Sequence, residues 1–430
     1  MSGTGDIELR HESAVSHDAH ITADAVARRS YGKLVAFLAA RTQNVAAAED
    51  ALSEAFTAAL TDWPSNGCPA NPEAWLLTVA RRKLIDMNRR HQTSEHAPRE
   101  LPYDDLQNIA ELLHTTPTDA DPIPDRRLAL MFACAHPAID AGIRAPLILQ
   151  VILGFDAEAI ASAFLMSPPT MGQRLVRAKN KIRHAGIPFR IPEREELPAR
   201  LDAVLQAIYA AFAEGWVDAA GTDVARRNLA EEAIYLGRVV AELLPDQPEA
   251  LGLVALMLYA EARRPARRSS DGDYIPLAEQ NAALWHVGLV REAEALLLDA
   301  SALGSIGRYQ LEAAIQSAHV TRKLTGESNW RAIVRLYDAL FTITNSPVVA
   351  INRALAIAEV DGPAAALKAM PDTFTEPSKL TEYQPYWAAR AELLTRSGAQ
   401  AEAREAYDIA IGLERDPAVR RFLQLRQGRL

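Results

Sequence analysis

The sequence has little cysteine and no long apolar run. Two cysteines, Cys68 and Cys134, in 430 residues cannot build a disulfide framework or a cysteine-rich metal site. The longest apolar stretches are about 11 residues long, whereas roughly 20 are needed to span a bilayer. The first 23 residues also lack the apolar segment of a secretory signal. We therefore expect a cytoplasmic protein without a membrane segment.

The common signatures of enzymes are missing as well. The sequence contains no phosphate-binding GxxxxGK[ST], no zinc-binding HExxH, no GxSxG nucleophile elbow and no dinucleotide-binding GxGxxG. We therefore expect no catalytic residues, no metal site and no cofactor, and a protein that is not an enzyme.

What the sequence has in excess is helix-forming residues. Long segments rich in Ala, Leu, Glu and Arg place apolar residues three and four positions apart, and no segment alternates convincingly as a strand would. This pattern predicts an all-α protein. Residues that interrupt helices, mainly Pro, Asp and Gly, divide the sequence into five parts. These are a flexible tail (1–23), a first helical block (24–92), an acidic linker (93–124), a second helical block (125–190) and a helical array (191–430).

The distribution of charge along the sequence leads to a different conclusion from the net charge. A net charge of −9 and a pI near 5.7 argue against a nucleic-acid partner. However, residues 81–90 hold five basic residues and one acid, and residues 159–192 hold six basic residues and no acid. Residues 94–125 between them hold eight acids and one arginine. Because phosphate contacts dominate affinity for DNA, two basic segments separated by an acidic linker indicate a DNA-directed protein.

The first basic helix is predicted over residues 72–90. Asn71 suits its N-cap and Pro72 its first position. Its basic residues recur seven positions apart and form a stripe two turns long: Arg82 with Arg89, and Lys83 with Arg90. From this helix alone, a solvated charged face is as good an interpretation as a DNA contact.

The second basic segment matches a helix-turn-helix. Asp156 is predicted to cap a short helix, and Ser167 to cap a second helix over residues 168–184. The first turns of that second helix would meet base edges, and its basic residues at three and four spacing share one face. Three apolar residues are predicted to point inward: Leu175, Val176 and Ile182. The alternative interpretation is an ordinary helical hairpin.

These motifs resemble a known family. Residues 47–60 (AAEDALSEAFTAAL) and 71–90 (NPEAWLLTVARRKLIDMNRR) resemble region 2 of bacterial sigma factors of the extracytoplasmic-function type, in the sigma-70 family. Residues 154–183 (GFDAEAIASAFLMSPPTMGQRLVRAKNKIR) resemble region 4 of the same proteins. The resemblance implies a sigma factor that binds the β′ clamp helices and the β flap of core RNA polymerase and directs it to promoter DNA.

The resemblance also implies roles for individual residues. Four residues would bind core polymerase: Asp50, Leu52, Glu54 and Phe56. Eight would capture a flipped base of the −10 element and hold the separated strand: Trp63, Asn66, Asn71, Arg81, Arg82, Lys83, Arg89 and Arg90. Six would contact the −35 element: Thr170, Gln173, Arg174, Arg177, Lys179 and Lys181. Trp63, at the start of the loop 63–71, is as good a candidate for the core as for stacking on a base.

The remaining residues look like tandem helical hairpins with a net charge of −7 over 193–430. The clearest unit lies at 386–417, where seven residues follow the tetratricopeptide pattern: Trp387, Ala391, Leu394, Gly398, Ala403, Tyr407 and Ala410. This part resembles the repeat extension of one subgroup of these sigma factors, which implies that it modulates activity. Its acidity suggests an intramolecular contact with the basic helices.

A polar insertion at 267–285 interrupts the array. It offers Asp271, Asp273 and Tyr274 as a regulatory contact, and the alternative is an exposed Asp-Gly turn. Two other functions also remain open. A helix-turn-helix regulator with repeats that sense a peptide or small ligand would not need the region-2 helices. A repeat scaffold without DNA binding would tolerate replacement of Arg174 and Arg177.

Overall fold

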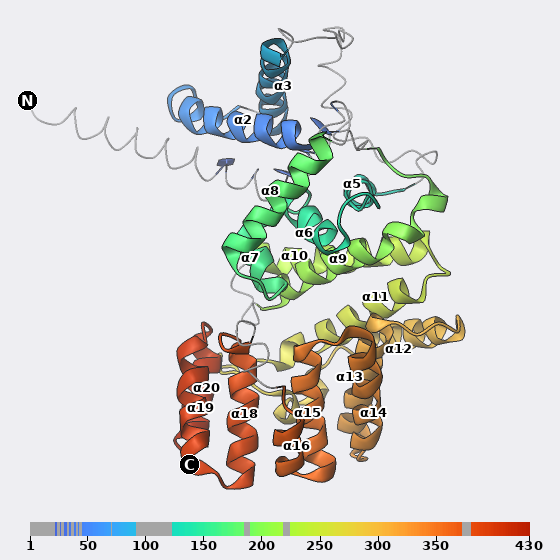
Figure 1. Ribbon diagram of the computed structural model, residues 1–430, viewed down its shortest axis with the longest axis vertical. Coiled ribbons are helices and arrows are strands. Elements are labelled where there is room, and N and C mark those ends of the chain that lie inside the picture. The colour runs from blue at the N-terminus through green and yellow to red at the C-terminus, as the bar shows by residue number, and fades with distance from the viewer. Residues whose placement is uncertain are drawn as a thin grey trace, which may run out of the picture. The chain divides into compact units, whose positions relative to one another are not determined.

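The structure is a computed structural model that describes residues 45–69, 71–91, 123–184, 190–217, 224–371 and 380–430, with scattered positions between 22 and 42. In these ranges the regular structure is helical (Figure 1), apart from one β-bridge between Arg268 and Tyr274, which confirms the predicted all-α class. None of the described helices is both long and apolar enough to cross a membrane. The predicted tail and acidic linker lie outside the described residues except at their ends.

The chain divides into two compact units, Met1–Ala207 and Ile208–Leu430. The N-terminal unit begins with α2 (Val45–Asn66) and α3 (Pro72–His91), which pack against each other. α2 buries small and apolar side chains three and four positions apart, which gives it one continuous inner face: Ala48, Ala51, Leu52, Ala55, Ala59 and Trp63. α3 begins as predicted, because the side-chain oxygen of Asn71 accepts a hydrogen bond of 3.1 Å from the N–H of Ala74.

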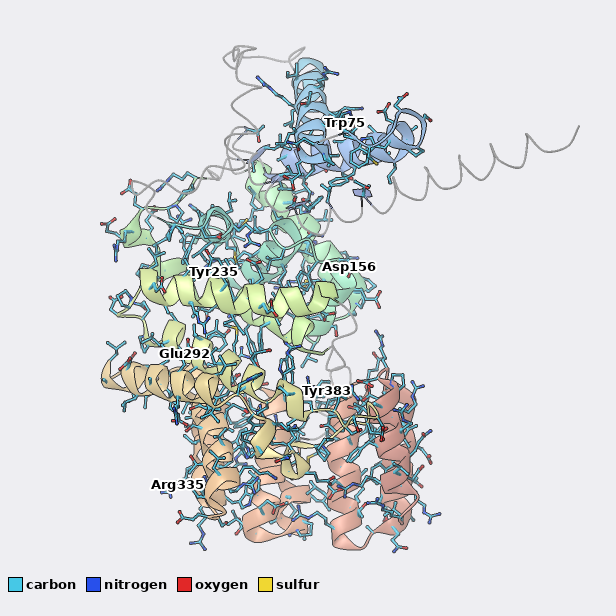
Figure 2. All side chains as sticks on the ribbon, turned by 180° about the vertical axis from the view of Figure 1, so that it is seen from behind. Trp75, Asp156, Tyr235, Glu292, Arg335 and Tyr383 are labelled. Atoms are coloured by element: carbon cyan, nitrogen blue, oxygen red, sulfur yellow. The ribbon has the colours of Figure 1, made fainter. Side chains whose placement is uncertain are left out.

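The second half of this unit contains α5 (Arg126–Cys134), α6 (Ala141–Val151), α7 (Ala157–Ala163) and α8 (Pro168–His184). Asp156, labelled in Figure 2, caps α7 as predicted by accepting a hydrogen bond of 2.8 Å from the N–H of Ala159. The Ser167 hydroxyl lies 2.7 Å from the Thr170 hydroxyl at the start of α8. α7 and α8 pack directly on each other, as they would in a helix-turn-helix or in an ordinary helical hairpin.

One prediction about α8 was wrong. Val176 does not point inward, because its side chain is 58% exposed. The buried stripe of the helix runs through Met171, Leu175 and Ala178. At 100° per residue, a side chain next to such a stripe turns toward solvent.

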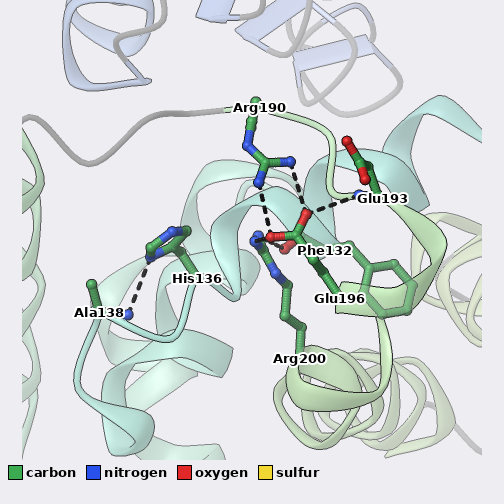
Figure 3. Close-up of polar contacts among 7 residues, drawn as sticks. All are labelled: Phe132, His136, Ala138, Arg190, Glu193, Glu196 and Arg200. Carbon is green, nitrogen blue, oxygen red and sulfur yellow. Dashed lines mark hydrogen bonds and ion pairs between the residues drawn. The ribbon is translucent and has the colours of Figure 1, made fainter.

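A polar network ties the residues after α8 to the N-terminal unit (Figure 3). Both Nη atoms of Arg190 donate to the Glu196 carboxylate, at 2.8 and 2.9 Å, and these bonds lower the pKa of Glu196. Arg200 is buried and donates to the carbonyl of Phe132 on α5 at 3.1 Å. Burial and the Arg200 charge lower the pKa of His136. Residues up to Ala207 therefore cluster with the N-terminal unit, although the sequence placed 191–207 with the array.

The boundary between the units falls inside α9 (Pro198–Val217). In the C-terminal unit each further helix packs against the next: α10 (Val224–Leu243), α11 (Pro248–Ala262), α12 (Val287–Ala302), α13 (Arg308–Thr325), α14 (Trp330–Thr344), α15 (Pro347–Asp361), α16 (Pro363–Ala369), α18 (Gln384–Ser397), α19 (Gln400–Leu413) and α20 (Pro417–Gln427). Short 3-10 helices lie at Arg194–Glu196, Arg264–Ala266, Leu277–Glu279 and Ala282–Leu284.

The pattern at 386–417 corresponds to α18 and α19. Ala391, Leu394, Ala403, Tyr407 and Ala410 form one buried cluster between these helices. Gly398 turns the chain between them with φ of +84°, a backbone conformation that favours glycine. The small residues therefore allow close helix packing, as the sequence predicted for this hairpin.

Candidate polymerase and DNA interface

The outer face of α2 carries exposed carboxylates. Asp50 and Glu54 lie four residues apart on the side opposite the buried stripe, and both are exposed. Their positions suit contact with a basic partner surface. Phe56 is only half-buried and packs against Tyr31, with ring centroids 6.0 Å apart.

Leu52, expected at the polymerase contact, is fully buried. Its place in the inner stripe with Ala48 and Ala55 makes it a core residue, so this expectation is wrong. The sequence placed it with Asp50 and Glu54 because all three lie in one short motif. Successive helix positions turn by 100°, however, so Leu52 cannot share the face of its neighbours.

Trp63 is not a stacking surface for a base. It lies within α2, not in the predicted loop, and its side chain is 0% exposed. Its ring packs edge-on against Trp75 of α3, labelled in Figure 2, with centroids 5.5 Å apart. The helix continues to Asn66 and ends where Gly67 adopts a φ of +83°. Of the two interpretations left open by the sequence, the core position is the correct one.

A surface pocket of about 670 Å³ lies between α2 and α3. It is lined by residues of α2 that are polar except for Ala58, and by one residue of α3: Glu54, Thr57, Ala58, Thr61, Asp62, Ser65, Asn66 and Lys83. The pocket therefore brings together Glu54, expected at the polymerase contact, with Asn66 and Lys83, expected at the −10 element.

The chemistry of this pocket follows from its hydrogen bonds. Lys83 pairs with Glu54 at 3.0 Å, and the Asn66 amide donates to Asp62 at 2.7 Å. The Thr57 and Thr61 hydroxyls donate to helix carbonyls, at 3.0 and 3.1 Å, so their lone pairs stay available. Two carboxylates against one ammonium repel phosphate. The pocket suits N–H donors, such as the edge of an unpaired base or a basic side chain.

The sequence missed Thr57, Thr61, Asp62 and Ser65 as pocket residues. The signal was present, because these polar residues and Glu54 recur at three and four spacing along α2. This signal was weaker than that of the acidic and apolar residues at 50–56, because threonine and serine also occur on ordinary solvated helix faces.

The basic residues of α3 differ in exposure. Arg82 is exposed and Arg81 is half-buried. Asn71 is exposed and caps the helix. Arg89 and Arg90 belong to α3, but their side chains lie outside the described residues. Arg82 is thus the α3 arginine whose described side chain faces solvent.

Four of the six residues expected at the −35 element are exposed on α8. These are Thr170, Gln173, Arg177 and Lys181. They lie on the side away from the buried stripe, in the helix that follows α7. This face offers hydroxyl, amide and cationic groups to a DNA groove.

The other two residues make contacts inside the unit. Arg174 is half-buried, and its guanidinium donates to the Met166 sulfur and the Gly142 carbonyl, each at 3.4 Å. Lys179 pairs with Glu49 of α2 at 2.5 Å. Lys179 therefore faces α2, contrary to the expectation that it faces DNA.

The polar insertion of the C-terminal unit folds onto α20. Asp273 pairs with Arg421 at 3.1 Å, and the Tyr274 ring packs edge-on against Phe422 with centroids 5.4 Å apart. Arg268 pairs with Asp416, the N-cap of α20. Asp273 and Tyr274 thus make contacts within the unit, although Asp273, like Asp271, is exposed. Tyr274 is half-buried and packs within the unit, and the regulatory contact expected here stays a prediction.

No cluster of three or more His, Cys, Asp or Glu side chains that could hold a metal ion occurs within the described ranges. His319 of α13 is packed edge-on against Trp330, with centroids 5.6 Å apart. Burial and the charges of Arg322 and Arg263 lower its pKa to about 4. His319 is therefore an uncharged packing residue at neutral pH.

Comparison with known proteins identifies the class of the N-terminal helices. Residues 26–94 match sigma-70 region 2, and residues 200–301 match a family of unknown function, DUF6596. The first match covers the α2 and α3 pair and supports a sigma-70 family sigma factor. It suggests a role in transcription initiation, with core RNA polymerase and promoter DNA as partners.

A relative that matches over most of both chains defines the family more closely. The chain is 36% identical over 383 residues to the uncharacterized protein R00370 of Rhizobium meliloti (strain 1021), covering 89% of this chain and 90% of the relative. The chain belongs to the same family as that protein. No solved structure gives a significant match.

Proposed function

We propose that the chain is a sigma factor of the extracytoplasmic-function type that acts in the cytoplasm, binds core RNA polymerase and directs promoter recognition, without catalytic residues of its own. The observation that carries this proposal is the region-2 match at 26–94, which coincides with the α2 and α3 pair. A second helix pair, α7 and α8, follows it, and the stretch from 159 to 192, which contains all of α8, has no acidic residue.

The exposed residues would contact different partners. The Asp50 and Glu54 carboxylates of α2 would meet a basic polymerase surface at the β′ clamp helices. The pocket between α2 and α3 would hold an unpaired base of the −10 element. The outer face of α8 would enter the −35 major groove, while Arg82 would neutralise phosphates.

The C-terminal unit would act as a tetratricopeptide-like extension that controls this activity. The buried small residues of α18 and α19 support the repeat interpretation. The acidic charge of residues 193–430 supports a contact with the basic helices. A chain that lacks 218–430, and so keeps α9 with the N-terminal unit, would contradict this role if its promoter output were unchanged.

The decisive test is to mix the purified chain with core polymerase and a promoter library. We expect co-elution with core polymerase and initiation at a restricted set of sequences. Glu54→Lys should abolish co-elution, whereas Glu158→Lys, at an exposed position of α7, should leave it intact. Failure of the unaltered chain to co-elute would contradict the proposal.

The second candidate is a helix-turn-helix regulator whose repeats sense a peptide or small ligand. The helix pair α7 and α8 is compatible with it. Such a regulator binds DNA without polymerase, so it predicts sequence-specific binding by the chain alone. The region-2 match favours the sigma factor, because a regulator has no need of that domain.

A further inference from the structure

The outer face of α12, in the C-terminal unit, carries apolar side chains that no other part of the described chain covers. The helix packs against α11 through its inner face, where its buried residues are Ala293 and Ala300. In the helix and the turns that flank it, five large apolar side chains are between 43% and 72% exposed: Leu284, Val287, Leu298, Leu303 and Ile306. A set of exposed apolar side chains gathered on one element marks an interaction surface.

The exposed residues of α12 follow one stripe along the helix. Arg291, Ala295, Leu298 and Ala302 recur at intervals of four, three and four positions, so they project from one face, and all four are exposed. The middle of this stripe is the small residue Ala295. Because the distance between two packed helices depends on the side chains at their contact, a small central residue allows a second helix to approach closely.

Two opposite charges flank the centre of the stripe at equal spacing. Arg291 lies four positions before Ala295, and Asp299 lies four positions after it. Both side chains are exposed, and neither makes a hydrogen bond or an ion pair within the described ranges. Their neighbour Glu292, by contrast, pairs with Arg238 of α10 at 2.8 Å. The outer face of α12 therefore presents one cation and one anion that the unit itself does not neutralise.

The face is complementary to a second copy of itself. In an antiparallel pair of α12 helices whose two-fold axis passes beside Ala295, each residue faces the position of the second copy that lies equally far on the other side of Ala295. Three pairs are related in this way, at four, eight and eleven positions from Ala295: Arg291 with Asp299, Val287 with Leu303, and Leu284 with Ile306. Charge therefore meets opposite charge and apolar side chains meet each other, and two-fold symmetry makes every contact twice.

We propose that the chain forms a homodimer through the outer face of α12, with the two helices antiparallel and Ala295 at the two-fold axis. The charges select this direction. In a parallel pair Arg291 would face the same residue of the second copy, and so would Asp299, and like charges repel each other. The dimer does not depend on the sigma-factor function, because its interface lies entirely in the C-terminal unit.

The size of the face sets the expected strength of the dimer. α12 contains 16 residues. At 1.5 Å per residue its length is about 24 Å. One pair of helices of this length falls at the lower end of specific interfaces, for which about 800 Å² per partner is the standard size. We therefore expect a reversible dimer with a dissociation constant on the order of 10 µM.

Sedimentation equilibrium of the full-length chain, at concentrations from about 1 to 100 µM, measures the association. We expect the average mass to rise with concentration from 47.0 kDa toward twice that value. Leu298→Glu places a carboxylate beside the axis of the dimer and should raise the dissociation constant at least about thirtyfold. The matched control is Leu425→Glu, because this leucine of α20 is similarly exposed and lies at the other end of the unit (Figure 1). It should leave the dissociation constant unchanged.

Charge reversals test the pairing itself. Arg291→Asp brings two carboxylates face to face at each contact and Asp299→Arg brings two cations face to face, so each should raise the dissociation constant at least about tenfold. An equimolar mixture of these two variants should dimerise like the unaltered chain, because each contact then joins opposite charges again. The chain that carries both substitutions should also dimerise, for the same reason. Arg335→Asp, at an exposed arginine of α14 that is labelled in Figure 2, should have no effect.

An unaltered chain that stays monomeric at about 100 µM would overturn the proposal. Equal weakening by Leu298→Glu and Leu425→Glu would also overturn it, and so would a mixture of the two charge reversals that remains monomeric. If the chain is monomeric and Leu298→Glu weakens binding to core polymerase, the face contacts polymerase and the homodimer is refuted. If the dimer forms as expected but no promoter supports initiation with core polymerase, the homodimer stands and the sigma-factor function fails.

Discussion

The two compact units use basic side chains in different ways. On the faces expected to meet DNA, the N-terminal unit leaves Arg82, Arg177 and Lys181 exposed. The C-terminal unit binds many of its arginines internally: Arg238 to Glu292 at 2.8 Å, Arg353 to Asp338 at 2.5 Å, and Arg396 to Glu359 at 2.5 Å. Glu292 is labelled on α12 in Figure 2. An arginine therefore indicates a nucleic-acid contact only when no carboxylate of its own unit neutralises it.

The same contrast recurs within the single helix α8. Arg177 and Lys181 are exposed, whereas Arg174 and Lys179 contact groups of their own unit. Basic residues at helical spacing thus do not act as one stripe. The difference predicts which substitutions change DNA binding and which change stability.

The largest expected effect concerns an internal group of the C-terminal unit. The pKa of His319 is lowered from 6.5 to about 4 by burial and by Arg322 and Arg263. The unfolded chain takes up a proton below pH 6.5 that the folded chain refuses, so stability falls as the pH is lowered through this window. The loss reaches up to about 3 kcal/mol near pH 4. Urea unfolding at pH 7.5, 6 and 5 measures it.

His319→Gln provides the control for this prediction, because glutamine does not titrate. The variant should show a smaller decrease in unfolding free energy between pH 7.5 and 5. Equal pH dependence in the two proteins would show that other groups dominate in this range.

The next effect concerns an exposed residue of the N-terminal unit. Arg177→Ala should weaken promoter-dependent initiation roughly ten- to hundredfold, which corresponds to about 1–3 kcal/mol, while unfolding stays unchanged. The matched control is Arg238→Ala, which should leave initiation intact and lower stability by up to about 1 kcal/mol. Transcription with core polymerase and urea unfolding measure the two properties. Equal loss of initiation in both variants would contradict the difference between the exposed arginines of the N-terminal unit and the paired arginines of the C-terminal unit.

A smaller effect tests the close packing of α11 and α13. A β-carbon at Gly252 would lie 2.7 Å from the backbone nitrogen of Gln310, whereas one at Gly288 would meet nothing within 4 Å. Gly252→Ala should therefore lower the free energy of unfolding by about 2 kcal/mol. Gly288→Ala should raise it by up to about 0.5 kcal/mol. Equal effects of the two substitutions would contradict the packing described for α11.

Local signals in the sequence were sufficient for much of the fold. Asn71 and Asp156 mark helix starts through capping bonds that involve only the next few residues. The start of α8 at Pro168 was predictable because proline suits the first position of a helix. Features that depend on near neighbours in the chain are therefore available from the sequence alone.

The candidate site was predictable only in part, because its key contacts join distant positions. Trp63 is a core residue because it packs on Trp75. Lys179 is an internal cation because it pairs with Glu49, 130 positions away. Helical spacing cannot reveal such a partner when several acidic residues are available. The buried position of Arg200 was not predicted, because its hydrogen-bond acceptor is the backbone carbonyl of Phe132. A backbone carbonyl has no sequence signature.

The smallest expected effect separates exposed from shielded ion pairs within the C-terminal unit. Asp273 and Arg421 pair at 3.1 Å, but their side chains are 62% and 54% exposed. A double-mutant cycle with Asp273→Asn and Arg421→Gln should give a coupling energy of no more than about 0.5 kcal/mol, decreasing further at high salt. Tyr274→Ala should cost more, because it removes the half-buried ring contact with Phe422. A coupling energy above about 1 kcal/mol would show that the exposed pair, and not the aromatic contact, holds the insertion on α20.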